Sequence, residues 1–495
     1  METFFIRAIQ LILSLSILVL LHEFGHFFFA RLFKVRVEKF YMFFNPTFSL
    51  IRAKKINGKW DVKYFAKNVP SNERPKLDAD GDPVVDEKNR QVMEPIPLDM
   101  LADDDWRKHP ESTEWGFGWL PLGGYCSISG MVDETKGIGQ LASEPQPWEY
   151  RSRSVWQRLP IITGGVLVNF LLAMVIFAGV LFVWGEEYIP LKNAKYGLQF
   201  SKTMLSAGFQ NGDKIISIDG KIPDSEGDIS EMVVIDKAKS AVVERNGQQQ
   251  KINLPADLSL KAIAANESFT ATVRFPFVVE DISSGTPAAK NNLQPGDSIV
   301  GINNKPLFGF QDVSDQLFAN KSKTIQLDYY RKGALQHQSI ALDDAGKLGV
   351  VVKTRFADIP TTVVRYGFLE SIPAGIGKGW DSLAKYVKGL KFVFTKEGAQ
   401  QLGGFGGIGK MFPKVWDWQM FWTMTALLSV ILAFMNILPI PMLDGGYVVY
   451  LIYEMITGRK PSDKFLEYAQ TIGMLLLLAL LLYANGNDIY KALFK

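Results

Sequence analysis

The chain has 495 residues, of which 47% are hydrophobic and 21% are charged, and its mean hydropathy is +0.05. Long apolar runs alternate with ordinary charged segments, so the composition argues against a wholly soluble protein and indicates a membrane protein with soluble parts. The formal net charge of +3 gives no support for a nucleic-acid partner. The single cysteine, Cys126, excludes an intrachain disulfide.

The first apolar segment lies within residues 1–33 and carries ionisable side chains near its end. No small-residue cleavage site follows it, so we expect a retained transmembrane helix rather than a signal peptide. His22 and His26 share one helix face, where two imidazoles can bind one Zn²⁺, and Glu23 can accept a proton from a water at that metal. The alternative is a pair of buried histidines bonded to backbone carbonyls or to each other. Ionisable groups inside a span are costly, which favours the functional site.

The loop from residue 34 to 158 contains two kinds of sequence. Residues 53–115 are charged and proline-containing, which predicts a surface hairpin or a partly disordered insert with turns such as DADGDP. Residues 118–131, GWLPLGGYCSISGM, are apolar and punctuated by glycine, which predicts a short β-hairpin at the bilayer surface.

A second transmembrane helix is expected over residues 159–184, and it contains one polar amide, Asn169. Two roles stay open for this side chain, namely a donor to unwound substrate backbone and an interhelical hydrogen bond.

The segment that follows contains an internal repeat. AGFQNGDKIISIDGKIP at 207–223 and NNLQPGDSIVGINNKPL at 291–307 each predict a Gly-Asp turn, a strand and a second turn. We expect one β-rich domain over 190–268 and another over 269–356. The pattern resembles the PDZ-domain signature, which implies peptide binding by strand addition or a size filter. Two β-rich spacers without a ligand are the alternative.

The last third of the chain contains an amphipathic segment and two further spans. The amphipathic helix expected over 374–396 fits the membrane interface and fits packing on the outer domain equally well. A third span is expected over 418–446 and a fourth over 467–485. The third ends in NILPIPMLDGG, where Pro439 and Pro441 exclude a regular helix. Extended backbone at membrane depth must line a cavity or be buried.

Asp444, in that strip, is the candidate third metal ligand. Lys/Arg clusters follow span one, precede span two and lie between spans three and four, so alternating spans place all of them on the cytoplasmic side. Both termini and residues 185–417 are then outside. Spans one and three end on the same side, which puts Asp444 at about the depth of His22 and His26. A helix cap for the next segment is the alternative role, and capping and ligation can coexist.

These motifs resemble those of the site-2 protease family of intramembrane zinc metalloproteases, and within it the bacterial regulator-of-sigma-E protease type. The family pairs HExxH on its first core helix with N-x-x-P-x-P-x-L-D-G on its third, which here are His22 to His26 and Asn436 to Gly445. The resemblance covers nearly the whole chain. It implies an α-helical polytopic membrane protein of about four transmembrane helices, with tandem β-rich PDZ-like domains and a membrane-associated β-hairpin.

The resemblance also implies roles for particular residues. It assigns Zn²⁺ to His22, His26 and Asp444 and the role of catalytic base to Glu23. By the same correspondence, Asn436 and Asn169 are substrate-binding residues. Asn169 closes a G-x-x-x-N match that starts at Gly165, although the proline that commonly follows this glycine is absent. The long insert at 53–115 and Asn45-Pro46, where the family has glycine before proline, are further departures that leave the substrate's route open.

The implied activity is hydrolysis of peptide bonds within transmembrane segments, in a bacterial inner (cytoplasmic) membrane. Implied substrates are transmembrane proteins such as an anti-sigma factor already trimmed by another protease, with remnant signal peptides as a further candidate. A membrane scaffold that recruits peptides through PDZ domains is one rival function, but it gives no reason for Glu23 between two imidazoles. A metal transporter is another, and it predicts several ionisable groups along a path, whereas the sequence shows one cluster.

Overall fold

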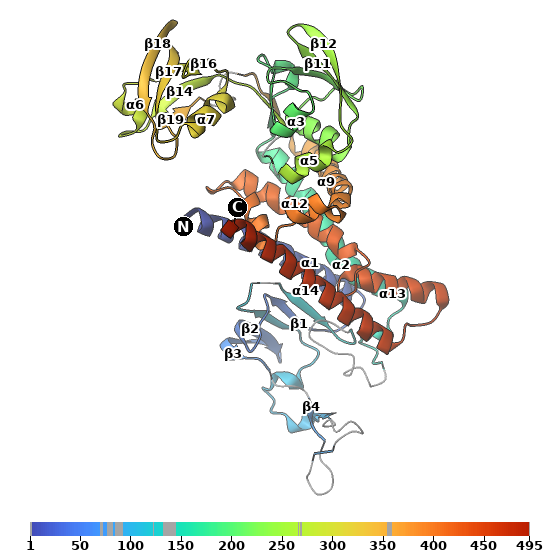
Figure 1. Cartoon of the computed structure of the whole chain (residues 1–495). Coiled ribbons are helices and arrows are strands. Elements are labelled where there is room, and N and C mark those ends of the chain that lie inside the picture. The colour runs from blue at the N-terminus through green and yellow to red at the C-terminus, as the bar shows by residue number, and fades with distance from the viewer. Residues whose placement is uncertain are drawn as a thin grey trace. The chain divides into compact units, whose positions relative to one another are not determined.

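The computed structural model of the chain describes residues 2–69, 73–76, 83–84, 93–121, 123–131, 145–265, 267, 270–353 and 359–494 (Figure 1). Internal contacts divide it into two compact units. The first comprises Met1–Val183, Gly367–Ala384 and Gly403–Lys495, and the second comprises Trp184–Tyr366 and Lys385–Leu402. In the charged segment at 53–115, residues 70–72, 77–82 and 85–92 lie outside the described parts, and with them most of the predicted DADGDP turn.

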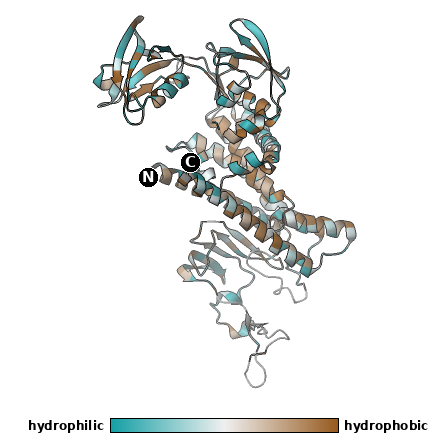
Figure 2. Cartoon of the chain, in the orientation of Figure 1, coloured by the Kyte–Doolittle hydropathy of each residue, from teal (hydrophilic) through white to brown (hydrophobic). Residues whose placement is uncertain are grey.

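Four helices of the first unit are long and apolar enough to cross a membrane, counted over the described residues. They are α1 (Glu2–Leu32), α2 (Val155–Val183), α12 (Trp418–Ile437) and α14 (Asp463–Phe494). Apolar residues predominate along them (Figure 2). Many of these apolar side chains are exposed on the protein surface, for example Val175 and Leu482, as expected for helices that face lipid rather than water.

The helices α1 and α2 approach each other at glycine. A Cβ atom on Gly25 would lie 2.3 Å from the carbonyl oxygen of Gly164, and one on Gly164 would lie 2.6 Å from the carbonyl oxygen of Gly25. Small residues allow such close backbone contact between helices in a membrane. The contact fixes the second half of α1 against the first half of α2.

A five-stranded sheet in the first unit follows α1. Its strand order is β3-β2-β6-β1-β7, with β1 and β6 parallel and the other neighbours antiparallel. Asn57 and Gly58 connect β2 to β3 in a two-residue turn with positive φ, the geometry that Asn-Gly favours. The bounds are β1 Val37–Met42, β2 Phe48–Ile56, β3 Lys59–Lys67, β6 Glu114–Phe117 and β7 Tyr125–Ile128. A separate small sheet pairs β4 (Glu73–Pro75) with β5 (Met93–Pro95).

The β-hairpin expected at 118–131 is not present in the described structure. The strand β7 pairs with β1, and β6 pairs with the other side of β1, so the two strands are separated by β1 instead of pairing with each other. The interpretation was wrong because local glycine spacing cannot reveal a strand from a distant part of the sequence. The residue paired with Tyr125 is Tyr41, 84 positions earlier in the chain.

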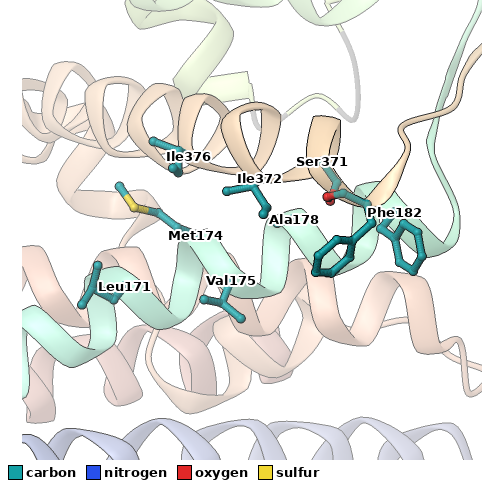
Figure 3. A pocket seen from close by; sticks show the side chains of 10 residues that line it. Leu171, Met174, Val175, Ala178, Phe182, Ser371, Ile372 and Ile376 are labelled. Carbon is teal, nitrogen blue, oxygen red and sulfur yellow. The ribbon is translucent and has the colours of Figure 1, made fainter.

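The amphipathic helix expected at 374–396 is α9 (Phe368–Leu390), and its residues up to Ala384 belong to the first unit. A Cβ atom on Gly375 would lie 2.4 Å from the backbone nitrogen of Ala178 in α2, so the two helices touch there. Beside this contact is an apolar cavity of about 460 Å³ (Figure 3). It is lined from α2 by Leu171, Met174, Val175, Ala178, Gly179 and Phe182, and from α9 by Phe368, Ser371, Ile372 and Ile376.

Two shorter helices belong to the first unit, α11 (Phe405–Met411) and α13 (Asp444–Thr457). The helix α10 (Lys396–Gln401) belongs to the second unit. The carboxylate of Asp488 in α14 accepts backbone N–H bonds from Gly404 (2.9 Å) and Gly407 (2.8 Å). Those bonds tie the glycine-rich start of α11 to the last part of α14.

The second unit contains the two repeats, and their equivalence extends to a buried ion pair. Asp213 accepts from Arg245 at 2.7 Å in the first repeat, and Asp297 accepts from Arg331 at 2.6 Å in the second. Each aspartate also accepts the N–H of the residue three positions before it. The Gly-Asp motif therefore closes its turn and anchors the arginine of a neighbouring strand in both copies.

The first repeat contains β9 (Leu198–Phe200), α3 (Lys202–Ser206), β10 (Lys214–Ile218), α4 (Glu226–Ser230), β11 (Ser240–Arg245), β12 (Gln248–Asn253), α5 (Leu258–Ala265) and β13 (Ala271–Val273). The second contains β14 (Phe277–Ile282), α6 (Pro287–Lys290), β15 (Ser298–Ile302), β16 (Lys305–Pro306), α7 (Phe310–Ala319), β17 (Thr324–Arg331), β18 (Ala334–Ala341) and β19 (Val350–Val352). Each has its own apolar core. The strands β8 (Glu186–Tyr188) and β20 (Thr362–Val364) pair where the chain enters and leaves this unit.

Candidate metal centre

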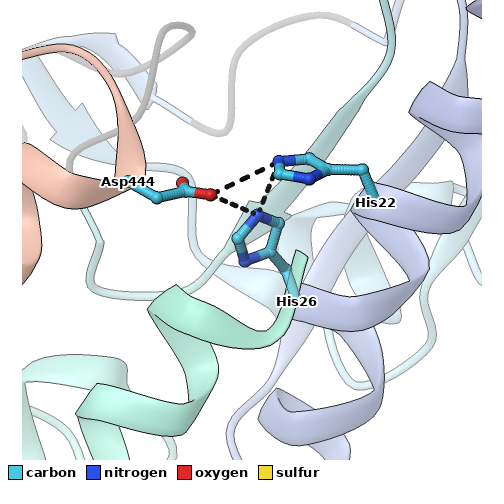
Figure 4. A group of neighbouring side chains, drawn as sticks. All are labelled: His22, His26 and Asp444. Carbon is cyan, nitrogen blue, oxygen red and sulfur yellow. Dashed lines mark hydrogen bonds and ion pairs between the residues drawn. The ribbon is translucent and has the colours of Figure 1, made fainter. Parts of the chain in front are cut away.

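Three side chains that are far apart in the sequence converge between α1 and the start of α13. Nε2 of His22 lies 3.3 Å from Nε2 of His26, and Oδ2 of Asp444 lies 3.4 Å from the first and 3.5 Å from the second. Figure 4 shows the three side chains pointing toward one another. They form a group of potential metal ligands in the described part of the chain.

The distances fit a tetrahedral metal site. Zinc ligands stand about 2.0–2.1 Å from the ion, and the edges of such a tetrahedron are about 3.3 Å long. Oδ2 of Asp444 is buried and has no hydrogen-bond partner among the described residues. A buried carboxylate oxygen without a hydrogen bond is costly, and a cation between it and the two imidazoles removes that cost. The donor set of two imidazoles and one carboxylate is one that Zn²⁺ accepts.

The backbone around Asp444 accounts for its position. The helix α12 ends at Ile437, the residues up to Leu443 are not helical, and α13 begins at Asp444. Met442 has φ = 78°, an uncommon conformation for a residue other than glycine. Leu443 occupies the N-cap position of α13, which has no side-chain cap hydrogen bond, and the carboxylate of Asp444 is directed to the histidines instead of taking the alternative capping role.

Gly165 of α2 lies against the rings of both histidines. A Cβ atom on this glycine would lie 2.6 Å from Nε2 of His26 and 2.6 Å from Cε1 of His22. Any larger residue would therefore displace the imidazoles. The G-x-x-x-N match in the sequence contained this glycine, but its role as space for the rings is visible only in the structure.

Each histidine has a partner on its second ring nitrogen. Nδ1 of His26 lies 2.8 Å from the carbonyl oxygen of Ile161, which can only accept, so this histidine carries its proton on Nδ1 and has a free lone pair on Nε2. Metal-binding histidines are commonly held in this way. Sequence reasoning missed Ile161 because the interacting group is a backbone carbonyl, which any residue would supply.

Asn169 contacts His22 from α2. Its Nδ2 lies 3.2 Å from Nδ1 of His22, while its Oδ1 is buried without a partner in the described structure. The two ends of an amide are nearly isosteric, and turning this one by half a turn lets Oδ1 accept the Nδ1–H of His22. That arrangement satisfies the oxygen and leaves the Nε2 lone pair of His22 for a metal.

Asn436 and Glu23, the other predicted site residues, also border the centre. Nδ2 of Asn436 lies 3.4 Å from Nε2 of His22. The carboxylate of Glu23 accepts a hydrogen bond from the backbone N–H of Cys126 in β7. A second backbone group that the sequence could not indicate therefore holds Glu23. All six predicted site residues lie at one place, with the edge strand β7 beside them.

Comparison with known proteins places the chain in a family. The model of peptidase family M50 matches residues 10–66 and 103–480, which is most of the chain, and the internal unmatched stretch, 67–102, lies within the charged insert. A Neisseria meningitidis protein named as a zinc metalloprotease is 24% identical over 97% of this chain and 98% of its own length. The protease RseP of Yersinia pestis is 24% identical over 96% of this chain and 97% of its own length.

Two further matches cover less of the chain. The regulator of sigma E protease of Haemophilus influenzae is 27% identical over 77% of this chain and 87% of its own length. The PDZ domain of an SdrC-like protein from Listeria monocytogenes matches 16% of this chain and 90% of that chain, with 21% identity and a TM-score of 0.15. The resemblance drawn from the two motifs is confirmed by the family match, and the chain belongs to peptidase family M50, whose members are zinc metalloproteases.

Proposed function

We propose that the chain hydrolyses peptide bonds within transmembrane segments of other proteins, with His22, His26 and Asp444 as zinc ligands and Glu23 as general base. One observation carries the proposal: the converging ligands lie partly on α1, a helix that is long and apolar enough to cross a membrane. A substrate bond cut at this centre is a bond at membrane depth.

The residues of the site divide the chemistry among them. When bound, zinc supplies Lewis-acid polarisation of the scissile carbonyl and makes a water molecule more acidic. Glu23 accepts the proton of the attacking water and returns it to the leaving amine. Ile161 and Asn169 hold the imidazoles in orientation. Asn436 is near enough to the centre to orient the substrate carbonyl through its amide.

The edge strand β7 suits the binding of an unwound substrate. A helical peptide bond is shielded by its own i to i−4 hydrogen bonds, so about one turn must open before hydrolysis. Among the described strands β7 is the last of its sheet, and an edge strand can pair with extended backbone. The bond from Cys126 to Glu23 places this edge beside the base.

We propose the topology that the Lys/Arg clusters predict, in a bacterial inner membrane. The termini and the two repeats are then periplasmic, and the metal centre lies toward the cytoplasmic side. In this arrangement the repeats act as PDZ-like modules that bind peptide or exclude bulky substrates. Candidate substrates are anti-sigma-factor-like membrane proteins already trimmed by another protease, and remnant signal peptides.

The test distinguishes the role of the proposed zinc ligands from that of the proposed general base. Zinc content and cleavage of a single-span reporter are measured for purified full-length chain. We expect His22→Ala and Asp444→Asn to lose both, and Glu23→Gln to keep zinc and lose cleavage by at least about 10²-fold. Zinc occupancy unchanged in both ligand variants contradicts the assignment. Proteomics of membrane stubs that accumulate with Glu23→Gln then identifies substrates, and a scaffold without protease activity would accumulate none.

A further inference from the structure

A buried ion pair joins the first turn of α2 to the last turns of α13. Nη2 of Arg158 lies 2.6 Å from Oε1 of Glu454, and the two side chains are 8% and 14% exposed. The guanidinium of Arg158 also lies over the ring of Tyr150, at 5.8 Å from its centroid. The pair therefore connects the two helices that border the histidines of the metal centre.

On α2, Arg158 belongs to the stripe of residues that surrounds the two imidazoles. Residues three, four and seven positions apart lie on one face of a helix, and eleven residues complete about three turns. Ile161, Gly165 and Asn169 follow Arg158 at spacings of three, seven and eleven residues. These residues hold the imidazoles or leave space for their rings. A group bound at Arg158 is therefore held on the face of α2 that orients the imidazoles.

On α13, Glu454 shares a face with Asp444, the carboxylate of the metal centre. Leu451 follows Asp444 by seven residues and Glu454 follows it by ten, so all three side chains lie within about a quarter-turn of one another. Leu451 belongs to the same buried cluster as Ile161 and Ile162 of α2. The face of α13 that carries the carboxylate is thus the face that packs on α2, and the ion pair is part of that interface.

The position of the Asp444 carboxylate follows the position of α13. Asp444 is the first residue of this helix, and the N-cap residue before it makes no side-chain cap bond. Ile452 and Ile456, on another side of α13, are 45% and 79% exposed. Apolar contacts give little preference for one position where lipid can replace them, whereas a directional polar contact favours a single register between two helices.

We propose that Arg158 and Glu454 are positioning residues, whose ion pair fixes the register of α13 on α2 and so keeps Oδ2 of Asp444 beside the two imidazoles. This role rests on the proposed function, in which Asp444 is a zinc ligand. Metal ligands must be held within about 0.5 Å of the required geometry. Glu454 lies about 15 Å along the helix from Asp444, so a small rotation or slide of α13 is enough to displace the carboxylate.

Replacement of both residues separates this role from a contribution to stability alone. Removal of one partner of a buried ion pair is strongly destabilising, because the other charge stays buried without compensation. Replacement of both partners by apolar side chains of similar volume is often neutral or stabilising. A chain changed at both positions should therefore stay folded while the fixed register of α13 is lost.

The experiment measures metal binding in the purified full-length chain. Competition with a chelator gives the zinc affinity, and the visible absorption of bound Co²⁺, which is strong in a tetrahedral site and weak in an octahedral one, reports the geometry. We expect Arg158→Met combined with Glu454→Met to unfold at a temperature no lower than the unchanged chain, to bind zinc at least about tenfold more weakly and to absorb less with Co²⁺. Zinc affinity and Co²⁺ absorption equal to those of the unchanged chain overturn the proposal.

Two single variants extend the test to the case in which the double variant does not fold. Glu454→Ala removes the acceptor for Arg158 and should weaken zinc binding by at least about tenfold. Glu454→Gln keeps an oxygen acceptor in the same place and should retain most of the affinity. Unchanged affinity in Glu454→Ala overturns the proposal. An equal loss in the two variants also overturns it, because the effect then belongs to the missing charge and not to the contact.

Two further variants serve as controls. Asp488→Ala breaks the bonds from Gly404 and Gly407 to α14, in the same unit but on neither α2 nor α13, so zinc affinity and Co²⁺ absorption should not change. A loss as large as that in Glu454→Ala would show that any destabilisation releases the metal, and would overturn the proposal. Zinc retained in His22→Ala contradicts the proposed function itself. Zinc lost in His22→Ala but kept in the double variant contradicts only the role of the ion pair.

Discussion

At the residue scale, the proposed metal centre depends on the groups that orient the two imidazoles as much as on the proposed ligands themselves. His26 is held by the carbonyl of Ile161 and His22 by the amide of Asn169, and Gly165 leaves space for both rings. The sequence left Asn169 with two open roles, a donor to substrate and an interhelical bond. Its contact is interhelical and is made to a proposed ligand, so its effect on the metal can be separated from its effect on substrate.

Asn169→Ala should weaken zinc binding by about 10- to 100-fold, the usual cost of losing the partner of a metal-binding histidine. Asn169→Asp keeps an oxygen acceptor for the Nδ1–H of His22 and should retain most of the affinity. Competition with a zinc chelator measures both, without reference to cleavage. Unchanged zinc affinity in Asn169→Ala, with a raised KM for substrate, would instead assign this residue to substrate binding.

Gly165→Ala tests the space beside the rings. The added methyl would stand about 2.6 Å from both imidazoles, so at least one ring must move away from the position that the three ligand atoms share. We expect loss of zinc with the membrane fold retained. Gly179→Ala is the matched control, because a Cβ atom there meets nothing within 4 Å. Full zinc content in Gly165→Ala would show that the rings adapt.

At the element scale, two repeats built on the same Gly-Asp turn have the same buried ion pair, although their intervening sequences differ. In each copy the aspartate is almost completely buried and receives both the arginine and a turn N–H. The carboxylate thus joins the turn to the strand that carries the arginine. A buried charge is tolerated only while its partners are present.

Arg331→Ala should destabilise the second repeat by about 3 kcal/mol, because it leaves the carboxylate of Asp297 buried without its cation. Hydrogen exchange of the full chain should then show faster opening of β15 and β17, and unchanged exchange in the first repeat. Lys323→Ala, at an exposed lysine just before β17, is the control. Equal acceleration in both repeats would show that they unfold as one cooperative unit.

At the scale of the whole molecule, the proposed catalytic residues all belong to the first unit and the repeats to the second. In the proposed topology the repeats are on the periplasmic side, so they cannot take part in bond cleavage directly. Their contribution is then the selection of substrates that reach the membrane-spanning unit.

Deletion of residues 190–350 should leave a chain that binds zinc and still cuts, with weaker discrimination between trimmed and untrimmed substrates. Cleavage of a matched pair of reporters, with and without a bulky periplasmic domain, measures the discrimination. The same deletion combined with Glu23→Gln is the inactive control. If the deleted chain folds and binds zinc but cuts neither reporter, the repeats are required for catalysis itself.

The sequence by itself determined the features that depend on local patterns. Apolar length gave the four long helices, the i, i+4 spacing placed His22 and His26 on one face, and the Gly-Asp motif located both repeats. The pair of motifs was sufficient to indicate the family, which the family match confirms. These inferences succeed because helix period, membrane thickness and turn chemistry act over a few to about twenty residues.

Tertiary structure alone decided the contacts between distant segments. Asn436 and His22 are 414 residues apart, Asn169 and His22 are 147 apart, and β1 pairs in parallel with β6, which begins 72 residues after β1 has ended at Met42. The partners Ile161 and Cys126 act through backbone atoms, which carry no signal of residue type. The exposed side of β3 could not be read from its alternation, because a period of two gives two faces without stating which one is covered. Trp106 makes that choice by contacting Asp61 and Lys54 on the other face.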